Sequence, residues 1–238
     1  PLNNTLSSYH SPPYGGGVGG RAFFMKNLSS IITSCLLASA MLLPSQALAK
    51  KRIPVFIVAG QSNTDGRVRN SQLPDYIKRD GYRHTYWCYN NAWYSSKGEF
   101  KKFWPWIYNG SDSCKWAYDA VTYYYLDRSM QSDYYVIKES RGGTAISTAC
   151  PTDNGFRWSA SPEFLNSTAA ADKGGKSLLK ALCENIDLCI DNTLSKKGRY
   201  DIRALIWHQG ESDRNDAAHY YDNVKAVITY IRQHIARK

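Results

Sequence analysis

Three short polar segments of this chain contain the residue types that cleave esters. A serine hydroxyl becomes a nucleophile when a base takes its proton, and backbone N–H groups can stabilise the oxyanion that forms. Glycine lets the backbone approach a substrate closely because it has no Cβ. The three segments contain, in chain order, Gln61, Ser62 and Asn63, then Gly142 and Gly143, and then His208, Gln209 and Glu211. Together these segments predict a site for acyl transfer.

Ser62 has two interpretations when it is considered alone. It lies two residues beyond an apolar run and could cap the helix that follows, which is a common role for serine. Ligands of open α/β sheets bind just beyond the carboxyl ends of the strands, which is also where Ser62 lies. The other two segments favour the second interpretation, in which the hydroxyl faces a substrate.

Each polar segment directly follows an apolar run that predicts a buried strand. The runs are Ile53–Val58, Tyr134–Ile137 and Ile202–Trp207. Continuous apolar runs are typical of parallel strands with helices on both faces, and parallel strands bring their carboxyl ends to one edge. We therefore expect an α/β fold, a three-layer α/β/α sandwich with a parallel central sheet and a flavodoxin-like plan.

Amphipathic segments between these runs predict the helices. Gly174–Leu194 and Ala217–Arg237 have apolar residues at helical spacing along one face, and Cys114–Met130 has a weaker version of this pattern. Thr64–Gly81 predicts a short helix followed by a loop. The aromatic region at 86–108 could stack on sugar rings or pack over the sheet, and we favour packing because large aromatic side chains dominate burial.

The length and the N-terminal pattern predict one exported domain. The chain has 238 residues, enough for one α/β domain with a full core. Residues 1–24 are expected to be a non-native leader. Residues 25–49 combine a basic start, an apolar run and a small-residue cleavage signal, which predicts a signal peptide and export to the periplasm or the exterior. A membrane anchor and lipid attachment at Cys35 are alternatives. The domain itself would span residues 50–238.

Net charge and cysteine content indicate which partners, metals and disulfides to expect. The net charge of +10 is scattered along the chain, whereas a nucleic-acid-binding protein clusters such charge on one face. No CxxC motif or His–Cys cluster indicates a metal, and no cofactor is called for.

Five cysteines follow the signal segment, and export permits disulfides. Cys88 with Cys114 is the most plausible bridge by elimination. The oligomeric state stays open.

Taken together, the three motifs resemble those of a known family. They are GQSN at residues 60–63, GGT at 142–144 and WHQGESD at 207–213. Their order and spacing resemble the SGNH-type hydrolases, specifically the sialate O-acetylesterase-like domain grouped with family 6 carbohydrate esterases. The resemblance covers about residues 52–238. It implies an esterase that releases acetate from acetylated carbohydrates, such as xylan decorations or sialic acids.

The resemblance also implies roles for individual residues. Ser62 is the expected nucleophile, and its own N–H and that of Gly143 are the expected oxyanion donors. The side chain of Gln209 is a further donor to the same oxygen, and Glu211 supports the site by orienting a histidine or a neighbouring turn. Three more residues are expected beside the oxyanion and the substrate: Gln61, Asn63 and Gly142.

The histidine base is the point at which the chain departs from the family. Related enzymes place it in an Asp-x-x-His segment near the C-terminus, after another strand, and we expect nothing like it after Asp213. His208 is the histidine best placed by position, although orienting the turn is the commoner role for such a residue. We therefore expect the domain to lack its C-terminal part. A non-catalytic carbohydrate-binding module is the alternative. A phosphate-binding domain would explain only the first motif.

Overall fold

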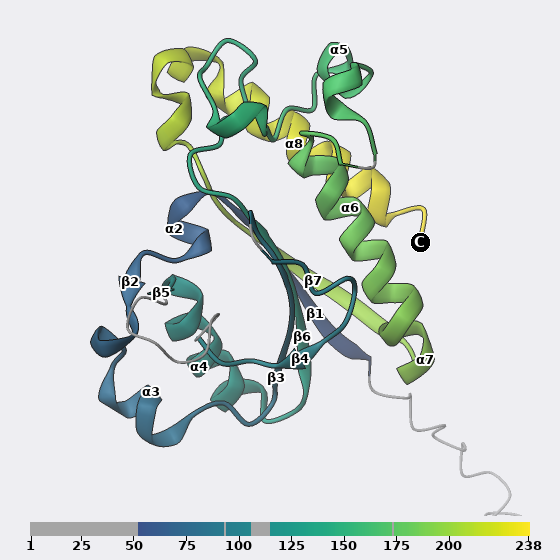
Figure 1. Cartoon of the computed structure of the whole chain (residues 1–238). Helices are drawn as coiled ribbons and strands as arrows, with labels where there is room; N and C mark the ends of the chain where they lie inside the picture. The colour runs from purple at the N-terminus through teal and green to yellow at the C-terminus, as the bar shows by residue number, and fades with distance from the viewer. Residues whose placement is uncertain (1–51, 93, 106–114, 173) are drawn as a thin grey trace, which may run out of the picture. The chain divides into compact units, whose positions relative to one another are not determined.

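The computed structural model describes residues 52–92, 94–105, 115–172 and 174–238. The predicted leader and signal peptide therefore lie outside the described residues. The larger sheet has five strands in the order β4-β3-β6-β1-β7, and a second sheet pairs β2 with β5 (Figure 1). The strands are β1 (Ile53–Gly60), β2 (Val68–Arg69), β3 (Thr85–Asn90), β4 (Lys101–Lys102), β5 (Lys115–Trp116), β6 (Tyr134–Ser140) and β7 (Tyr200–His208).

The main sheet is mixed, so the predicted parallel sheet is present in part, with one antiparallel pair. β1 pairs in parallel with both β6 and β7, and β3 pairs in parallel with β6. β4 pairs antiparallel to β3, with Tyr86 opposite Lys102. β4 follows β3 through a short irregular segment, and such a return needs no crossover helix. The α/β class itself is confirmed.

Helices cover both faces of the main sheet. Figure 1 shows α6 and α8 on one face and α2, α3 and α4 on the other. The α-helices are α2 (Ser62–Asp65), α3 (Asp75–Asp80), α4 (Tyr118–Met130), α5 (Pro162–Leu165), α6 (Leu178–Cys189), α7 (Ser195–Lys197) and α8 (Tyr220–Ile235). The tighter 3-10 turns are η1 (Asn70–Gln72), η2 (Asp153–Gly155), η3 (Thr168–Ala170) and η5 (Glu211–His219), and η4 (Ile190–Leu194) is a π-helical turn. No helix in the described ranges is long and apolar enough to cross a membrane.

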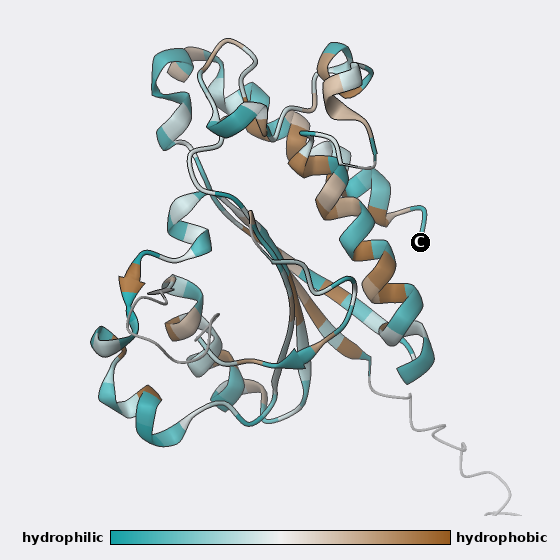
Figure 2. Ribbon diagram, viewed as in Figure 1, coloured by the Kyte–Doolittle hydropathy of each residue, from teal (hydrophilic) through white to brown (hydrophobic). Residues whose placement is uncertain are grey.

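The two long predicted helices are present with shorter bounds. Ser177 caps α6, because its hydroxyl accepts a hydrogen bond from the backbone N–H of Lys180 at 3.2 Å. The last helix begins at Tyr220 rather than at Ala217, since the preceding residues form η5. Hydrophobic residues lie along β1 and α6 in Figure 2, as the sequence periodicity predicts.

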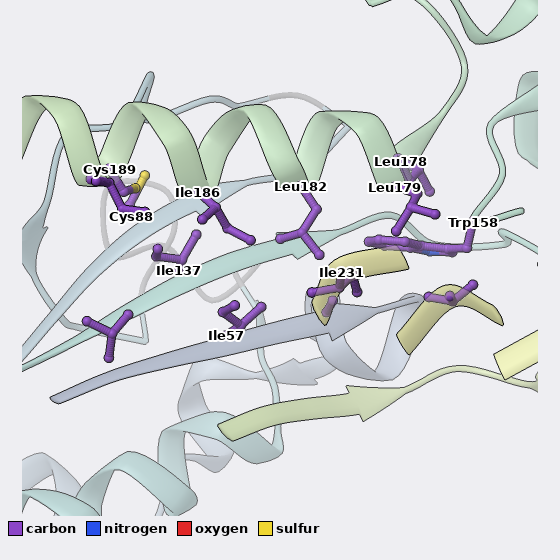
Figure 3. Close-up of a cluster of buried hydrophobic side chains, with 14 of the residues drawn as sticks. Ile57, Cys88, Ile137, Trp158, Leu178, Leu179, Leu182, Ile186, Cys189 and Ile231 are labelled. Atoms are coloured by element: carbon purple, nitrogen blue, oxygen red, sulfur yellow. The ribbon is translucent and has the colours of Figure 1, made fainter. Parts of the chain in front are cut away.

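One hydrophobic core lies on each face of the sheet. Ile57 belongs to the core between the sheet and helices α6 and α8, where it lies near Leu182 and Ile231 (Figure 3). Its neighbours Phe56 and Val58 belong to the core under α3 and α4. β1 is therefore buried on both faces, because successive side chains of a strand point in opposite directions. This burial holds the end of β1, and with it Ser62, in a fixed place.

β7 differs from its prediction as a buried strand. It pairs only with β1 and forms an edge of the sheet, with Arg203 and Ala204 exposed. In contrast, every residue of β6 is buried, including Lys138 and Glu139. Lys138 donates to Asp119 at 2.5 Å, which compensates for the burial of its charge.

Two tryptophans of the aromatic region at residues 86–108 pack against the core that lies under α3 and α4. Trp87 and Trp104 both contact that core, which confirms the packing interpretation for these two residues, while Trp93 and Trp106 lie outside the described residues. Cys88 is a buried free thiol that donates to Asn185 Oδ1 at 3.2 Å. The predicted bridge from Cys88 is therefore not formed at Cys88, and its proposed partner, Cys114, lies outside the described residues.

Candidate active site

The three predicted turns meet at the carboxyl edge of the sheet. The backbone N–H of Gln61 donates to His208 O at 3.1 Å, and that of Arg141 donates to Gly60 O at 3.2 Å. Gly60 is also in register with Ser140 on β6 and with His208 on β7. The turn that contains Ser62 therefore lies between the other two, at the one sheet edge that the sequence predicts for all three.

Ser62 is not a helix cap in this structure. It is the first residue of α2, and the cap position belongs to Gln61, which makes no side-chain capping bond. Ser62 is partly exposed, and its hydroxyl makes no hydrogen bond to any other described residue. The backbone N–H groups of Ser62 and Gly143 likewise donate to no described backbone oxygen. A free hydroxyl and two free N–H groups are what an acyl-transfer site needs.

Gly142 lies against the side chain of Ser62. A Cβ built on Gly142 would lie 3.7 Å from Ser62 Cβ and 2.3 Å from Arg67 Nη2. The absence of a side chain therefore leaves room for the Arg67 guanidinium next to the serine. Arg67 also donates to Asp65 Oδ2 at 2.9 Å. Arg67 is not among the site residues predicted from the sequence, although it follows the first motif by only four residues.

Gln209 connects all three turns. Its Nε2 donates to Asp213 Oδ2 at 2.5 Å, to Thr144 O at 2.9 Å and to Gln61 Oε1 at 3.3 Å. All three partners are acceptors, so the amide nitrogen must face them. The hydrogens of Gln209 are thus engaged within the protein in this structure, and its contact with a substrate oxygen stays a prediction.

Glu211 links the nucleophile turn to His208. Its Oε1 accepts a hydrogen bond of 2.5 Å from Asn63 Nδ2 and lies 4.0 Å from His208 Nε2. The His208 side chain is 49% exposed and packs on Tyr118, with ring centroids 5.4 Å apart. Burial raises the pKa of Tyr118 to about 12, so that ring is neutral beside the histidine. Glu211 contacts both the neighbouring turn and a histidine.

Asp65, the last residue of α2, links this short helix to other parts of the chain. It is buried and accepts hydrogen bonds from Tyr89 Oη at 2.8 Å, from Asn91 Nδ2 at 3.2 Å and from Ser140 Oγ at 3.2 Å. These donors come from β3, the segment after it, and β6. The sequence places Asp65 in the GQSNTDG segment, but its role depends on donors from distant parts of the chain.

A second histidine dyad lies in η5. His219 Nδ1 is 2.5 Å from Asp216 Oδ1, and Ser147 Oγ donates to Asp216 Oδ2 at 2.5 Å. The hydrogen bond to Asp216 raises the pKa of His219 above its ordinary value. Asp216 and His219 form an Asp-x-x-His segment that begins three residues after Asp213, so the expectation that nothing like it follows Asp213 is wrong. Next to this dyad, Asp213 is buried and accepts from the backbone N–H of Ser147 at 2.7 Å.

Within the described ranges, no group of three or more His, Cys, Asp or Glu residues is arranged to hold a metal ion. The site therefore consists of a serine, backbone N–H groups, two carboxylate–histidine pairs and one arginine. This set is suited to nucleophilic attack on an ester carbonyl and to stabilisation of the oxyanion.

Comparisons with known proteins agree with this arrangement. The family model described as carbohydrate esterase, sialic acid-specific acetylesterase, matches residues 52–238. No curated protein matches the chain. The X-ray structure of a protein from Arabidopsis thaliana is similar with a TM-score of 0.50 and 16% sequence identity, over 78% of this chain and 70% of that one. At that identity, the similarity concerns the fold alone.

Proposed function

The chain belongs to the carbohydrate esterase family of sialic acid-specific acetylesterases, and from this premise we propose that it removes acetyl groups from sugars through an acyl-enzyme on Ser62. The observation that carries the proposal is the convergence of three turns around one free serine hydroxyl. Gly142 contacts Ser62 from the second turn, and the Glu211–Asn63 bond joins the third.

In the proposed first step, Ser62 Oγ attacks the acetyl carbonyl and its proton passes to a base. The carbonyl oxygen becomes an oxyanion, which the N–H groups of Ser62 and Gly143 stabilise. The sugar then leaves as an alcohol, taking the proton from the base. Water attacks the acetyl-serine in the second half of the reaction, and acetate leaves. One oxyanion donor contributes roughly 10²–10³ in rate in comparable sites.

We assign the base to His208, with Glu211 as its carboxylate partner. His208 is in register with Gly60, two residues before the nucleophile, and its ring is half exposed. Its 4.0 Å separation from Glu211 is longer than a hydrogen bond, but catalytic contacts in ligand-free sites often tighten only when substrate binds. The Asp216–His219 dyad is the competing assignment, and Ser147 links it to the turn that contains Gly143.

The second candidate function is a carbohydrate-binding module without catalysis. It is favoured by one observation, that Ser62 Oγ has no hydrogen-bonded base within the described part of the chain. In this case the same turns would hold the acetylated sugar without cleaving it. The two candidates differ in whether the serine is reactive.

The test is Ser62-dependent turnover of 4-nitrophenyl acetate by residues 50–238, together with covalent labelling by a fluorophosphonate. We expect both in the wild type, and we expect Ser62→Ala to lose the label and at least ~10³-fold of the rate. Ser195→Ala, at an exposed serine on α7, is the matched control. A folded wild type without turnover or label, which still binds acetylated sugar, would identify the binding module instead.

We also propose that residues 25–49 direct export, since acetylated glycans outside the cell are then the accessible substrates. N-terminal sequencing of the exported protein is expected to begin at Lys50, and a retained segment from Met25 would contradict this. The helices on both faces of the sheet support a three-layer sandwich of the SGNH type as the full description of the fold.

A further inference from the structure

A cavity of about 350 Å³ lies beside the turn that contains Gly142, and the proposed reaction does not use it. Its walls come from the ends of β3 and β6 and from one side of α6. Polar residues line it toward the strands and the helix, namely Asn90, Asn91, Glu139, Arg141, Glu184 and Asn185. Its size lies in the range of small-molecule pockets in proteins.

Two buried polar groups on the cavity wall have no partner among the described residues. They are Glu139 Oε2 and Asn185 Nδ2, on side chains that belong to residues 5% and 1% exposed. Asn185 Oδ1 accepts a hydrogen bond from the thiol of Cys88 at 3.2 Å, and Asn185 Nδ2 is the end of the amide without a partner among the described residues. Buried polar groups in proteins are nearly always hydrogen-bonded, so this pair indicates a bound group that supplies both a donor and an acceptor.

The chemistry of the wall favours a neutral, hydroxylated ligand. Burial raises the pKa of Glu139 to about 8, so the group is mostly protonated at neutral pH and can both donate and accept. Arg141 is already paired with Asp153 at 2.8 Å. Leu178, Ala181 and Leu188 add an apolar side to the cavity. Hydroxyls beside an apolar C–H face are the features of a sugar ring.

The cavity and the nucleophile share one stretch of chain. Arg141 lines the cavity, and the next residue, Gly142, contacts Ser62. Asn91 also lines the cavity and donates to Asp65 of the nucleophile helix at 3.2 Å. β6 lies between β3 and β1, so roughly two strand spacings, ~10 Å, separate the two places. A neighbouring residue of the same oligosaccharide can span such a distance.

We propose that this cavity is a second sugar subsite, which binds a neutral sugar residue next to the acetylated one. The inference rests on the proposed function, because it takes the acetylated sugar at Ser62 as its reference. It assigns Glu139 and Asn185 as the polar contacts of the neutral residue and α6 as its apolar wall.

The test fills the cavity. Ala181→Phe places a ring in it from α6, Ala181→Leu is a milder version in case the first variant does not fold, and Ala226→Phe on the exposed side of α8 is the control. Binding of the neutral disaccharides xylobiose and lactose is measured by titration calorimetry. KM and kcat are measured with O-acetylated xylobiose and with 4-nitrophenyl acetate.

We expect the wild type to bind at least one disaccharide and both Ala181 variants to lose that binding. With O-acetylated xylobiose, KM rises about tenfold or more while kcat is unchanged, and turnover of 4-nitrophenyl acetate does not change. Absence of disaccharide binding, or an unchanged KM, would show that only water occupies the cavity and would overturn the inference. Absence of Ser62-dependent turnover with disaccharide binding intact would instead overturn the proposed esterase and leave the sugar site standing.

Discussion

The side chain of Asn63 donates a hydrogen bond of 2.5 Å to Glu211, although 148 positions separate the two residues. Asn63 directly follows Ser62, and Glu211 begins η5 after the last strand. The bond therefore fixes the nucleophile turn relative to His208, which lies 4.0 Å from the same carboxylate oxygen. The Glu211 side chain thus contributes to the positions of three residues with different proposed roles, namely Ser62, Asn63 and His208.

The first prediction concerns this bond. Glu211→Gln and Asn63→Ala are each expected to lower kcat/KM by about tenfold or more, because Asn63→Ala removes the hydrogen bond that holds the Ser62 turn and Glu211→Gln removes the carboxylate charge beside His208. A double-mutant cycle on kcat/KM should give a coupling of ~1 kcal/mol, as expected of a charged hydrogen bond that is partly exposed. Strictly additive effects would show that the two side chains act independently.

The second prediction concerns space beside the nucleophile. Gly142→Ala puts a methyl group 2.3 Å from Arg67 Nη2, so the guanidinium must move away from Ser62. The protein should fold normally, because only a flexible side chain is displaced, while kcat/KM falls by roughly 10–100-fold. Thermal unfolding and steady-state kinetics together measure this. A fully active variant would show that the space is not needed.

Gly143 and Gly174 form a matched pair for comparison, because both have a backbone φ of +70° but only Gly143 is a predicted oxyanion donor. Gly143→Ala should lower the free energy of unfolding by ~1 kcal/mol and also reduce activity, because the predicted oxyanion N–H shifts. Gly174→Ala should lower the free energy of unfolding by a similar amount and leave activity unchanged, since nothing lies within 4 Å of its added Cβ.

The third prediction separates the two candidate bases. His208→Ala is expected to lower kcat by 10²–10⁴-fold, the usual contribution of a general base, whereas His219→Ala should change it by less than about threefold. His84→Ala is the control, because His84 pairs with Asp133 just before β3 begins. Loss of activity in His219→Ala alone would move the role of the base to the Asp216–His219 dyad.

The fourth prediction concerns Asp213, which is 1% exposed and accepts backbone N–H bonds from Ile146 and Ser147. Asp213→Asn replaces an acceptor oxygen by an amide donor facing other donors. Denaturant unfolding should show a loss of ~2–4 kcal/mol, and Asp222→Asn on the exposed side of α8 should show almost none. A loss of less than ~1 kcal/mol in the free energy of unfolding would mean that the turns joined by Asp213 rearrange without cost.

The fifth prediction concerns the pH dependence of stability. Burial raises the folded-state pKa of Glu139 from 4.5 to about 8, so the folded protein binds a proton that the unfolded chain has released. The contribution of Glu139 to the free energy of unfolding is therefore full below about pH 4.5 and decreases as pH rises toward 8, by up to ~1.4 kcal/mol per pH unit.

Glu139→Gln mimics the protonated side chain and should flatten this dependence between about pH 5 and 8. The measurement is urea unfolding at several pH values, with Glu163→Gln on α5 as the exposed control. Identical slopes for the wild type and Glu139→Gln would contradict the raised pKa.

Most of the fold follows from local patterns in the sequence. The apolar run at the start of β1 and the amphipathic stripes of α6 and α8 state which face of each element is buried, and this is a property of residues close together in the chain. The order of strand, polar turn and helix places the turns of Ser62, Gly143 and Gln209 at one sheet edge. For these features, spacing alone is sufficient.

The hydrogen-bond partners of individual side chains and the edge position of β7 depended on the tertiary structure. β7 is as apolar as a central strand, yet no strand in the described part of the chain pairs with its outer side, and no local sequence pattern distinguishes an edge strand from a central one. Cys88 and Cys189 are free thiols that both donate to Asn185 Oδ1, and Asp65 accepts hydrogen bonds from donors on β3 and β6. Glu139 resembles a surface residue at the end of a strand in the sequence, but it lies buried on the wall of a cavity.

The sequence by itself thus determined the family and the sheet edge at which Ser62 lies. Only the tertiary structure decided which side chains hold Ser62 in place, which carboxylates face histidines and where a second pocket opens. The physical reason is that burial periodicity is encoded over a few consecutive residues. A hydrogen bond such as that from Asn63 to Glu211 depends instead on how strands and turns far apart in the chain pack against each other.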